Sequence, residues 1–121
     1  MISFLTKEFT DFRGDKHLVT ACIFRETSIW QLGWACQHVG DKCDMKLAKQ
    51  IAVNRASNHR VNNVIECVAP GFIHANEGKF MEFILKCYID YLCDNPAIMI
   101  KGYKHEKTRY LKKQQQIIDN V

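Results

Sequence analysis

Five residues with reactive or metal-binding side chains lie within nine positions of the chain: Cys36, His38, Asp41, Cys43 and Asp44. Thiolates and imidazoles are zinc ligands, and a structural zinc site typically combines two close pairs of them. Cys36 and His38 form one pair, but Cys43 has no second ligand at the required spacing. We therefore predict no metal site in this stretch and no cofactor.

A cysteine nucleophile is the other chemistry that this stretch permits. Cys43 lies just before a predicted helix, whose N-terminus favours the thiolate, and His38 is close enough in the sequence to act as a base. No third group is present to orient that histidine. Four of the six cysteines lie within apolar runs, which is typical of buried free thiols in a reducing compartment. We expect no catalytic residue, and cysteine-dependent catalysis stays an alternative.

Two apolar runs ahead of this stretch predict a β-hairpin. Residues 17–25 are rich in β-branched and aromatic side chains, and residues 29–39 follow after a short polar connection. Every second side chain of a strand lies on the same face. In the second run one face carries Trp30, Leu32, Trp34, Cys36 and His38. We expect this tryptophan face to be buried.

The rest of the chain is predicted to alternate between helices and strands. Asp41 or Asp44 caps a helix that ends near residue 58. The apolar positions on its inner face are Leu47, Ala48, Ile51, Ala52 and Ala56. The later elements are a strand over 61–69, a largely buried helix over 78–93, a strand over 97–103 and a polar helix over 105–119. The last helix is expected to dock through Tyr110, Leu111, Ile117 and Ile118.

With a possible first strand over 2–9, these elements follow the order β-β-β-α-β-α-β-α. The pattern predicts one α+β domain over residues 1–121, in which two to three helices pack an antiparallel sheet. The order is similar to that of ribonuclease H-like proteins, whose chemistry needs clustered carboxylates for two divalent ions. Asp11, Asp44 and Glu66 are the only such trio, but Glu66 lies within a predicted strand and the first helix contains no glutamate. Nuclease activity is therefore only an alternative.

The positive charge of the chain is concentrated at its C-terminal end. Residues 1–100 carry eleven basic and eleven acidic side chains, whereas residues 101–121 carry six basic and two acidic ones. The last segment, a predicted basic helix over about 101–121, thus accounts for the whole net charge of +4. A polyanion or an acidic protein would be attracted to this end first.

The basic residues are the stronger indication of a binding function. The first helix and its continuation carry Lys42, Lys46, Lys49, Arg55 and Arg60. In the C-terminal segment cations surround two tyrosines: Lys101, Tyr103, Lys104, Lys107, Arg109, Tyr110, Lys112 and Lys113. Such interleaving lets cations contact phosphates while aromatic rings stack on bases, so DNA or RNA is a candidate partner. A solvated helix face and a surface for an acidic protein are equally open interpretations.

A short motif around the first helix resembles a family of small tailed-bacteriophage proteins of uncharacterised function. The matching residues are Cys36, Gln37, His38, Asp41 and the run Lys46-Leu47-Ala48-Lys49-Gln50-Ile51-Ala52-Val53-Asn54-Arg55-Ala56. In that family a strand ends in Cys-His-Pro, an Asp follows, and a helix reads Lys-Ile-Gly-Arg-x-Ile-Ala-x-Gly-Arg-Ala. Here Gln37 separates the cysteine from the histidine, the proline is absent, and Ala48 and Asn54 stand where the family has glycines. The resemblance covers about a quarter of the chain and implies a phage accessory protein made inside the bacterium.

Together these features predict a protein that acts by binding and not by catalysis. Our first hypothesis is inhibition of a host protein or an anti-phage defence protein by occupation of its surface, and the second is direct nucleic-acid binding. The charged residues Lys7, Glu8 and Asp11 interrupt the apolar start, and no run is long enough to span a bilayer. We therefore expect no membrane contact and a location in the bacterial cytoplasm. The oligomeric state is left open by the sequence.

Overall fold

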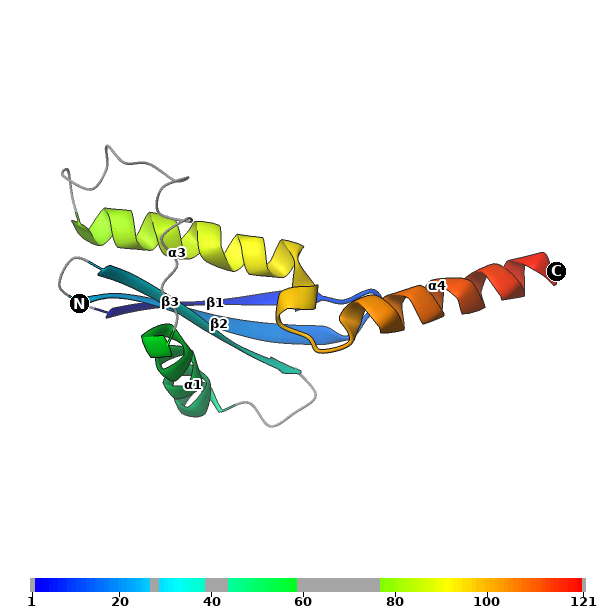
Figure 1. The fold of residues 1–121 in the computed structure, drawn as a ribbon, viewed down its shortest axis with the longest axis horizontal. Coiled ribbons are helices and arrows are strands. Elements are labelled where there is room, and N and C mark those ends of the chain that lie inside the picture. Colours follow the sequence, from blue (N-terminus) through cyan, green and yellow to red (C-terminus); the bar gives the residue numbers. More distant parts are fainter. Residues whose placement is uncertain (1, 27–28, 39–43, 59–76, 121) are drawn as a thin grey trace.

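The computed structural model describes residues 2–26, 29–38, 44–58 and 77–120 of the chain. Three strands, β1 (Ile2–Thr10), β2 (Lys16–Glu26) and β3 (Ile29–His38), pair in the order β1-β2-β3 as an antiparallel sheet. The helices are α1 (Met45–Asn58), α3 (Glu77–Asp94), the short 3₁₀ helix η2 (Pro96–Ile98) and α4 (Tyr103–Asp119). The predicted α+β class with an antiparallel sheet is confirmed (Figure 1). The strand predicted over 61–69 lies outside the described residues.

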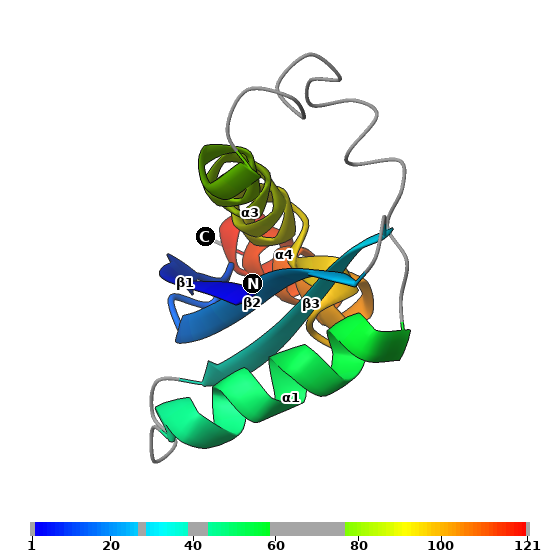
Figure 2. The same cartoon turned by 90° about the vertical axis from the view of Figure 1, so that its left-hand side faces the viewer.

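The sheet is covered by α3 on one face and by α1 on the other (Figure 1, Figure 2). On the α3 face, Val19, Ala21 and Ile23 of β2 and Trp30 and Leu32 of β3 are buried. The tryptophan face of β3 is thus buried at its start, as predicted, although the strand becomes exposed towards His38. The opposite face of β3 is buried as well, because α1 covers it.

Helix α1 approaches β3 at backbone contact distance through a stripe of small residues. A Cβ atom added to Gly33 would lie 2.1 Å from the carbonyl oxygen of Ala52 and 2.5 Å from the backbone nitrogen of Ala56. Ala48, Ala52 and Ala56 are buried in this contact. Leu47, predicted on the inner face, is 51% exposed instead. Only small side chains fit where the two backbones come this close, so the three alanines face the sheet and the larger Leu47 side chain lies away from it.

Helix α3 supplies most of the large apolar side chains of the core. Its buried residues are Phe80, Met81, Ile84, Leu85, Tyr88, Ile89 and Leu92. The predicted largely buried helix is therefore confirmed, with Lys79, Glu82 and Lys86 on its exposed side. Phe83 and Tyr91 also follow the apolar period that predicts this helix, but both are exposed, because the buried arc is centred one position later along the helix.

The segment over 97–103 is not a strand, which corrects the sequence-based prediction. Pro96 begins the 3₁₀ helix η2, and its carbonyl oxygen accepts hydrogen bonds from the backbone N–H groups of Met99 (3.0 Å) and Ile100 (2.9 Å). The chain then reverses at Gly102, whose φ of 79° is readily adopted only by glycine. The apolar run therefore forms a compact connection between α3 and α4.

Helix α4 extends away from the sheet and the other two helices (Figure 1). It contains no buried residue. Of the four residues predicted to dock it, only Tyr110 packs on the rest of the described chain, whereas Leu111, Ile117 and Ile118 are 54%, 61% and 65% exposed. The docking prediction is wrong for these three, because the helix passes beyond the end of the sheet. None of the helices in the described parts of the chain combines the length and apolar composition needed to cross a membrane.

Candidate functional site

Two tyrosines hold the base of α4 against the turn that joins β1 and β2. The ring of Phe12, in that turn, meets Tyr103 edge-on at 5.1 Å between centroids and Tyr110 at 5.4 Å. The two tyrosines are seven residues apart, which places them on the same side of the helix. Both rings predicted to stack on nucleic-acid bases are thus packed against Phe12.

Asp11 organises the turn that carries Phe12. Its Oδ1 accepts hydrogen bonds from the backbone N–H groups of Arg13 (2.8 Å) and Asp15 (3.0 Å), and its Oδ2 lies 2.9 Å from Nε2 of His17. Gly14 completes the reversal with a φ of 86°. Burial raises the pKa of Asp11, but the hydrogen bonds from His17 and from the two N–H groups outweigh it and hold the pKa below its ordinary value. The ionised carboxylate therefore stabilises the turn.

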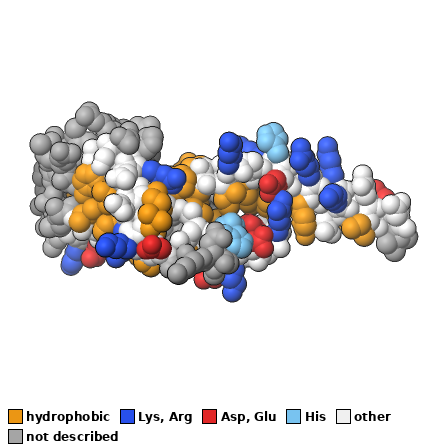
Figure 3. Space-filling view, turned by 90° about the horizontal axis from the view of Figure 1, so that it is seen from below, with side chains coloured by type: hydrophobic (Ala, Val, Ile, Leu, Met, Phe, Trp, Pro, Cys, Tyr) orange, Lys and Arg blue, Asp and Glu red, His pale blue; other side chains and the backbone are white. Residues whose placement is uncertain are grey.

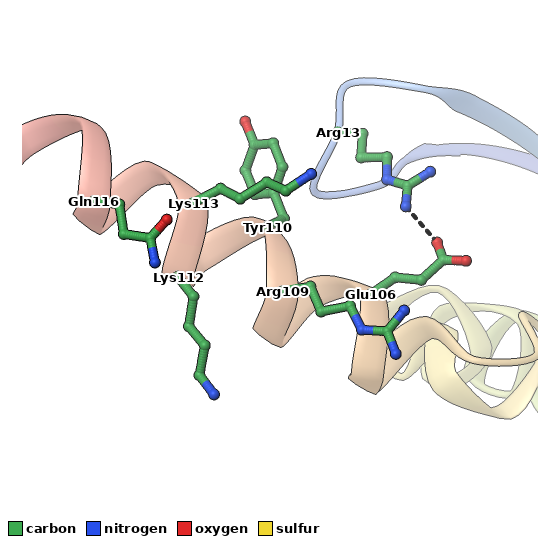
Figure 4. Close-up of a pocket in the computed structure, with 7 residues that line it drawn as sticks. All are labelled: Arg13, Glu106, Arg109, Tyr110, Lys112, Lys113 and Gln116. Carbon is green, nitrogen blue, oxygen red and sulfur yellow. Dashed lines mark ion pairs between the residues drawn. The ribbon is translucent and has the colours of Figure 1, made fainter.

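Arg13 projects from the same turn to α4 and pairs with Glu106, with 2.7 Å between Nη2 and Oε2. The two residues border a shallow hollow of about 630 Å³. The basic hollow, as we name it, is lined by Arg13, Glu106, Arg109, Tyr110, Lys112, Lys113 and Gln116. Lys113 reaches towards the turn and Arg109 lies beside Glu106, while Lys112 points away at the outer rim (Figure 4). Four cations and one carboxylate therefore line this space, with Lys112 at its rim.

Arg13 was missed by the sequence analysis, which placed the basic site in the C-terminal segment alone. Its only sequence signal is its position between two predicted strands, next to the aromatic residue Phe12. The docking of α4 onto Phe12 brings it to Arg109 and Lys113, and no local pattern encodes that docking. Of the other predicted residues, Lys101, Lys104 and Lys107 are exposed but do not line the basic hollow.

Helix α4 also exposes apolar side chains. Leu111 and Ile118 lie seven residues apart on one line of the helix, and Ile117 continues the line of Tyr110 beyond its contact with Phe12. We call Leu111, Ile117 and Ile118 the apolar edge of α4. Hydrophobic side chains lie exposed next to Lys and Arg side chains along this helix (Figure 3).

The basic residues predicted on α1 lie on a different part of the surface. Lys46 and Lys49 are exposed, and Nζ of Lys49 lies 5.3 Å from the ring centroid of Phe4. Arg55 donates a hydrogen bond from Nη1 to the carbonyl oxygen of Trp34 (3.0 Å) and covers the Trp34 ring at 4.3 Å. Helix α1 lies beneath the sheet and α4 beyond its end, so the two sets do not form one continuous face (Figure 1). Lys42 and Arg60 lie outside the described residues.

In the stretch 36–44, which carries the candidate reactive residues, the described residues have structural roles. Burial raises the pKa of the Cys36 thiol to about 11, so this group is protonated near neutral pH. Asp44 caps α1, as predicted, by accepting a hydrogen bond from the backbone N–H of Leu47 (3.1 Å). Among the described residues, no three His, Cys, Asp or Glu side chains are grouped so that they could hold a metal ion. Cys43 and Glu66 lie outside the described residues.

Comparisons of the chain with models of protein families, with curated proteins and with solved structures found no match.

Proposed function

We propose that this protein is a phage accessory protein that acts without catalysis, by inserting the apolar edge of α4 into a groove on an acidic protein. The partner would be a host protein or an anti-phage defence protein, inhibited by occupation of its surface. The observation that carries the proposal is the exposure of Leu111, Ile117 and Ile118 on a helix that extends beyond the sheet. Amphipathic helices commonly bind other proteins through such anchors at helical spacing.

Charge complementarity favours an acidic partner over a second copy of this chain. Residues 101–121 carry a net charge of +4, so two such helices side by side would repel each other. An acidic groove would instead attract the cations that flank the apolar edge while the edge itself is buried. Tyr103, Tyr110 and the pair between Arg13 and Glu106 already hold the base of α4, which lowers the entropy lost on binding.

The test is affinity capture from lysate of infected bacteria, after nuclease treatment, with matched variants of α4. Ile118→Asp places a carboxylate on the apolar edge, and Gln116→Asp places the same group on the other side of the helix. We expect a protein retained by the original chain to be lost with Ile118→Asp and kept with Gln116→Asp. Equal retention by both variants, or no retained protein after nuclease treatment, would contradict the proposal.

Nucleic-acid binding is the second candidate function. It is favoured by a different observation, the approach of Arg13 to Arg109 and Lys113 at the basic hollow. Phosphate contacts release counterions, so binding of this kind must weaken as salt increases. Retention on immobilised DNA that is unchanged between low and moderate salt would rule it out.

A further inference from the structure

We propose that the basic hollow binds successive phosphates of a nucleic-acid backbone and leaves the bases unread. The inference rests on the second candidate function, nucleic-acid binding, and names the residues that contact the phosphates. The phosphate ligands are Arg13 from the β1–β2 turn and Arg109, Lys112 and Lys113 from α4.

Arg13 has two neighbours that orient its side chain before any ligand arrives. Its guanidinium carbon lies 5.5 Å from the ring centroid of Phe12, and Nη2 is paired with Glu106. A guanidinium has five N–H donors, so the pair with one carboxylate oxygen leaves donors for a phosphate. An arginine that its neighbours already orient loses less side-chain entropy when it binds.

The positive charge of the basic hollow is not balanced within the described structure. Four cations face one carboxylate, and Glu106 is already engaged by Arg13. Arg109, Lys112 and Lys113 form no ion pair with any residue in the described parts of the chain. Such a group of cations attracts a polyanion because its binding releases condensed counterions.

The length of the basic hollow fits a backbone better than a single phosphate. Its lining on α4 extends from Glu106 to Gln116. Ten helical steps at ~1.5 Å span ~15 Å, which is longer than the distance between consecutive phosphates of one strand. Several phosphates can therefore lie along the helix, with Lys112 at the outer rim contacting one of the last.

The two tyrosines make base stacking unavailable at this site. Tyr103 and Tyr110 pack against Phe12, and to turn either ring towards a base would undo the contact that holds α4. Contacts made to phosphates alone, without stacking on bases, carry no sequence information. Affinity should therefore be the same for unrelated sequences, and also for a strand that lacks bases.

The test measures binding of the full chain to short DNA duplexes of two unrelated sequences across a salt series. Four phosphate contacts predict a slope of about −3.6 in log affinity against log salt, or about 150-fold weaker binding at about 200 mM than at about 50 mM. Arg13→Ala should reduce the slope by about 0.9. Lys104→Ala removes the same charge from the opposite side of α4 and should leave the slope unchanged.

Glu106→Gln separates a phosphate site from a purely structural role of these residues. It removes the single carboxylate from the basic hollow and should tighten DNA binding about two- to fivefold. If Arg13 and Glu106 served only to hold α4, the same change would weaken binding or leave it unchanged. A single-stranded oligonucleotide without bases should bind as tightly as one of the same length with bases.

The outcomes distinguish failure of this site from failure of the second candidate function. DNA binding with normal salt dependence in Arg13→Ala, or a clear preference for strands with bases, would overturn the proposed site and leave nucleic-acid binding intact. Absence of duplex binding at low salt would overturn both.

Discussion

Helices α1 and α4 are both attached to the sheet, but by opposite kinds of contact. Helix α1 lies across β3 through Ala48, Ala52 and Ala56, and Gly33 lets the two backbones meet. Helix α4 is held at its base by the Phe12 ring and one ion pair, and the rest of its length is exposed. Helix α1 therefore cannot shift without clashes, whereas most of the surface of α4 is accessible to a partner.

The largest effect is expected where α1 meets the sheet. Gly33→Ala places a Cβ atom inside the contact with the backbone of Ala52 and Ala56, so we expect the free energy of unfolding to fall by about 3 kcal/mol. Urea unfolding measures the change. Leu47→Ala, on the exposed side of α1, serves as the control and should change it by less than about 0.5 kcal/mol. Equal losses in the two variants would contradict the close approach.

A smaller effect is expected at the turn beneath α4. Asp11→Asn removes the ionised acceptor of three hydrogen bonds and should lower the free energy of unfolding at neutral pH by about 1 to 2 kcal/mol. Asp15→Asn, in the same turn but with an exposed side chain, is the control and should have little effect.

The stabilisation by Asp11 should also depend on pH. Its pKa in the folded protein lies below the ordinary value of 3.8, so the folded state binds this proton less readily than the unfolded chain does. The stabilisation is present above the unfolded-state pKa and is lost as the pH falls through the lower, folded-state pKa. Unfolding measured between neutral and acidic pH should therefore show a flatter acid limb for Asp11→Asn. Parallel curves would refute this account.

The Phe12 contact should affect α4 more than the sheet. Phe12→Ala removes two edge-on aromatic contacts and should lower the free energy of unfolding by about 1 kcal/mol. Hydrogen exchange should accelerate over Tyr103–Asp119 and change little over Glu77–Asp94. Tyr110→Phe keeps the ring and should leave both helices as they are. Uniform acceleration in both helices would show that α4 is not a separately held element.

The smallest effect is expected at the apolar edge. Ile117→Ala and Ile118→Ala should each change the free energy of unfolding by less than about 0.5 kcal/mol, because both side chains are already exposed. Ile84→Ala makes the same substitution in the core and should lower it by about 3 kcal/mol. A substantial loss in either α4 variant would mean that the edge is buried within the protein, which would remove the basis of the proposed function.

The fold class and most element positions follow from patterns that are local in the sequence. Alternation along residues 29–39 predicts a strand, and the apolar period of residues 78–93 predicts a buried helix; the structure contains β3 and α3 at these places. The prediction of a strand over 97–103 was wrong. This short apolar run has no clear strand or helix period, and Pro96 begins a 3₁₀ helix there instead. Leu47 was misplaced because the sequence does not reveal how closely α1 approaches Gly33.

The candidate site could be predicted only in part, because the sequence does not show which elements pack against one another. The cations of α4 are evident from composition, but Arg13 joins them through the docking of Phe12 on two tyrosines. Those tyrosines were interpreted as stacking groups because their spacing among lysines is typical of nucleic-acid binding. Spacing along one helix shows which side chains share a side, and it does not show which element covers that side.

The hydrogen bond from Arg55 to the carbonyl oxygen of Trp34 affects where a strand from another molecule can be added to the sheet. β3 is one border of the described sheet, and there Arg55 occupies a backbone acceptor that a foreign strand would need. The other border, along β1, presents no such obstruction among the described residues. If each copy of the chain can add a strand at only one border of its sheet, strand addition stops at a pair of chains and cannot continue into a fibre. The Arg55 bond therefore makes the β3 border of the described sheet a poorer template for a foreign strand than the β1 border.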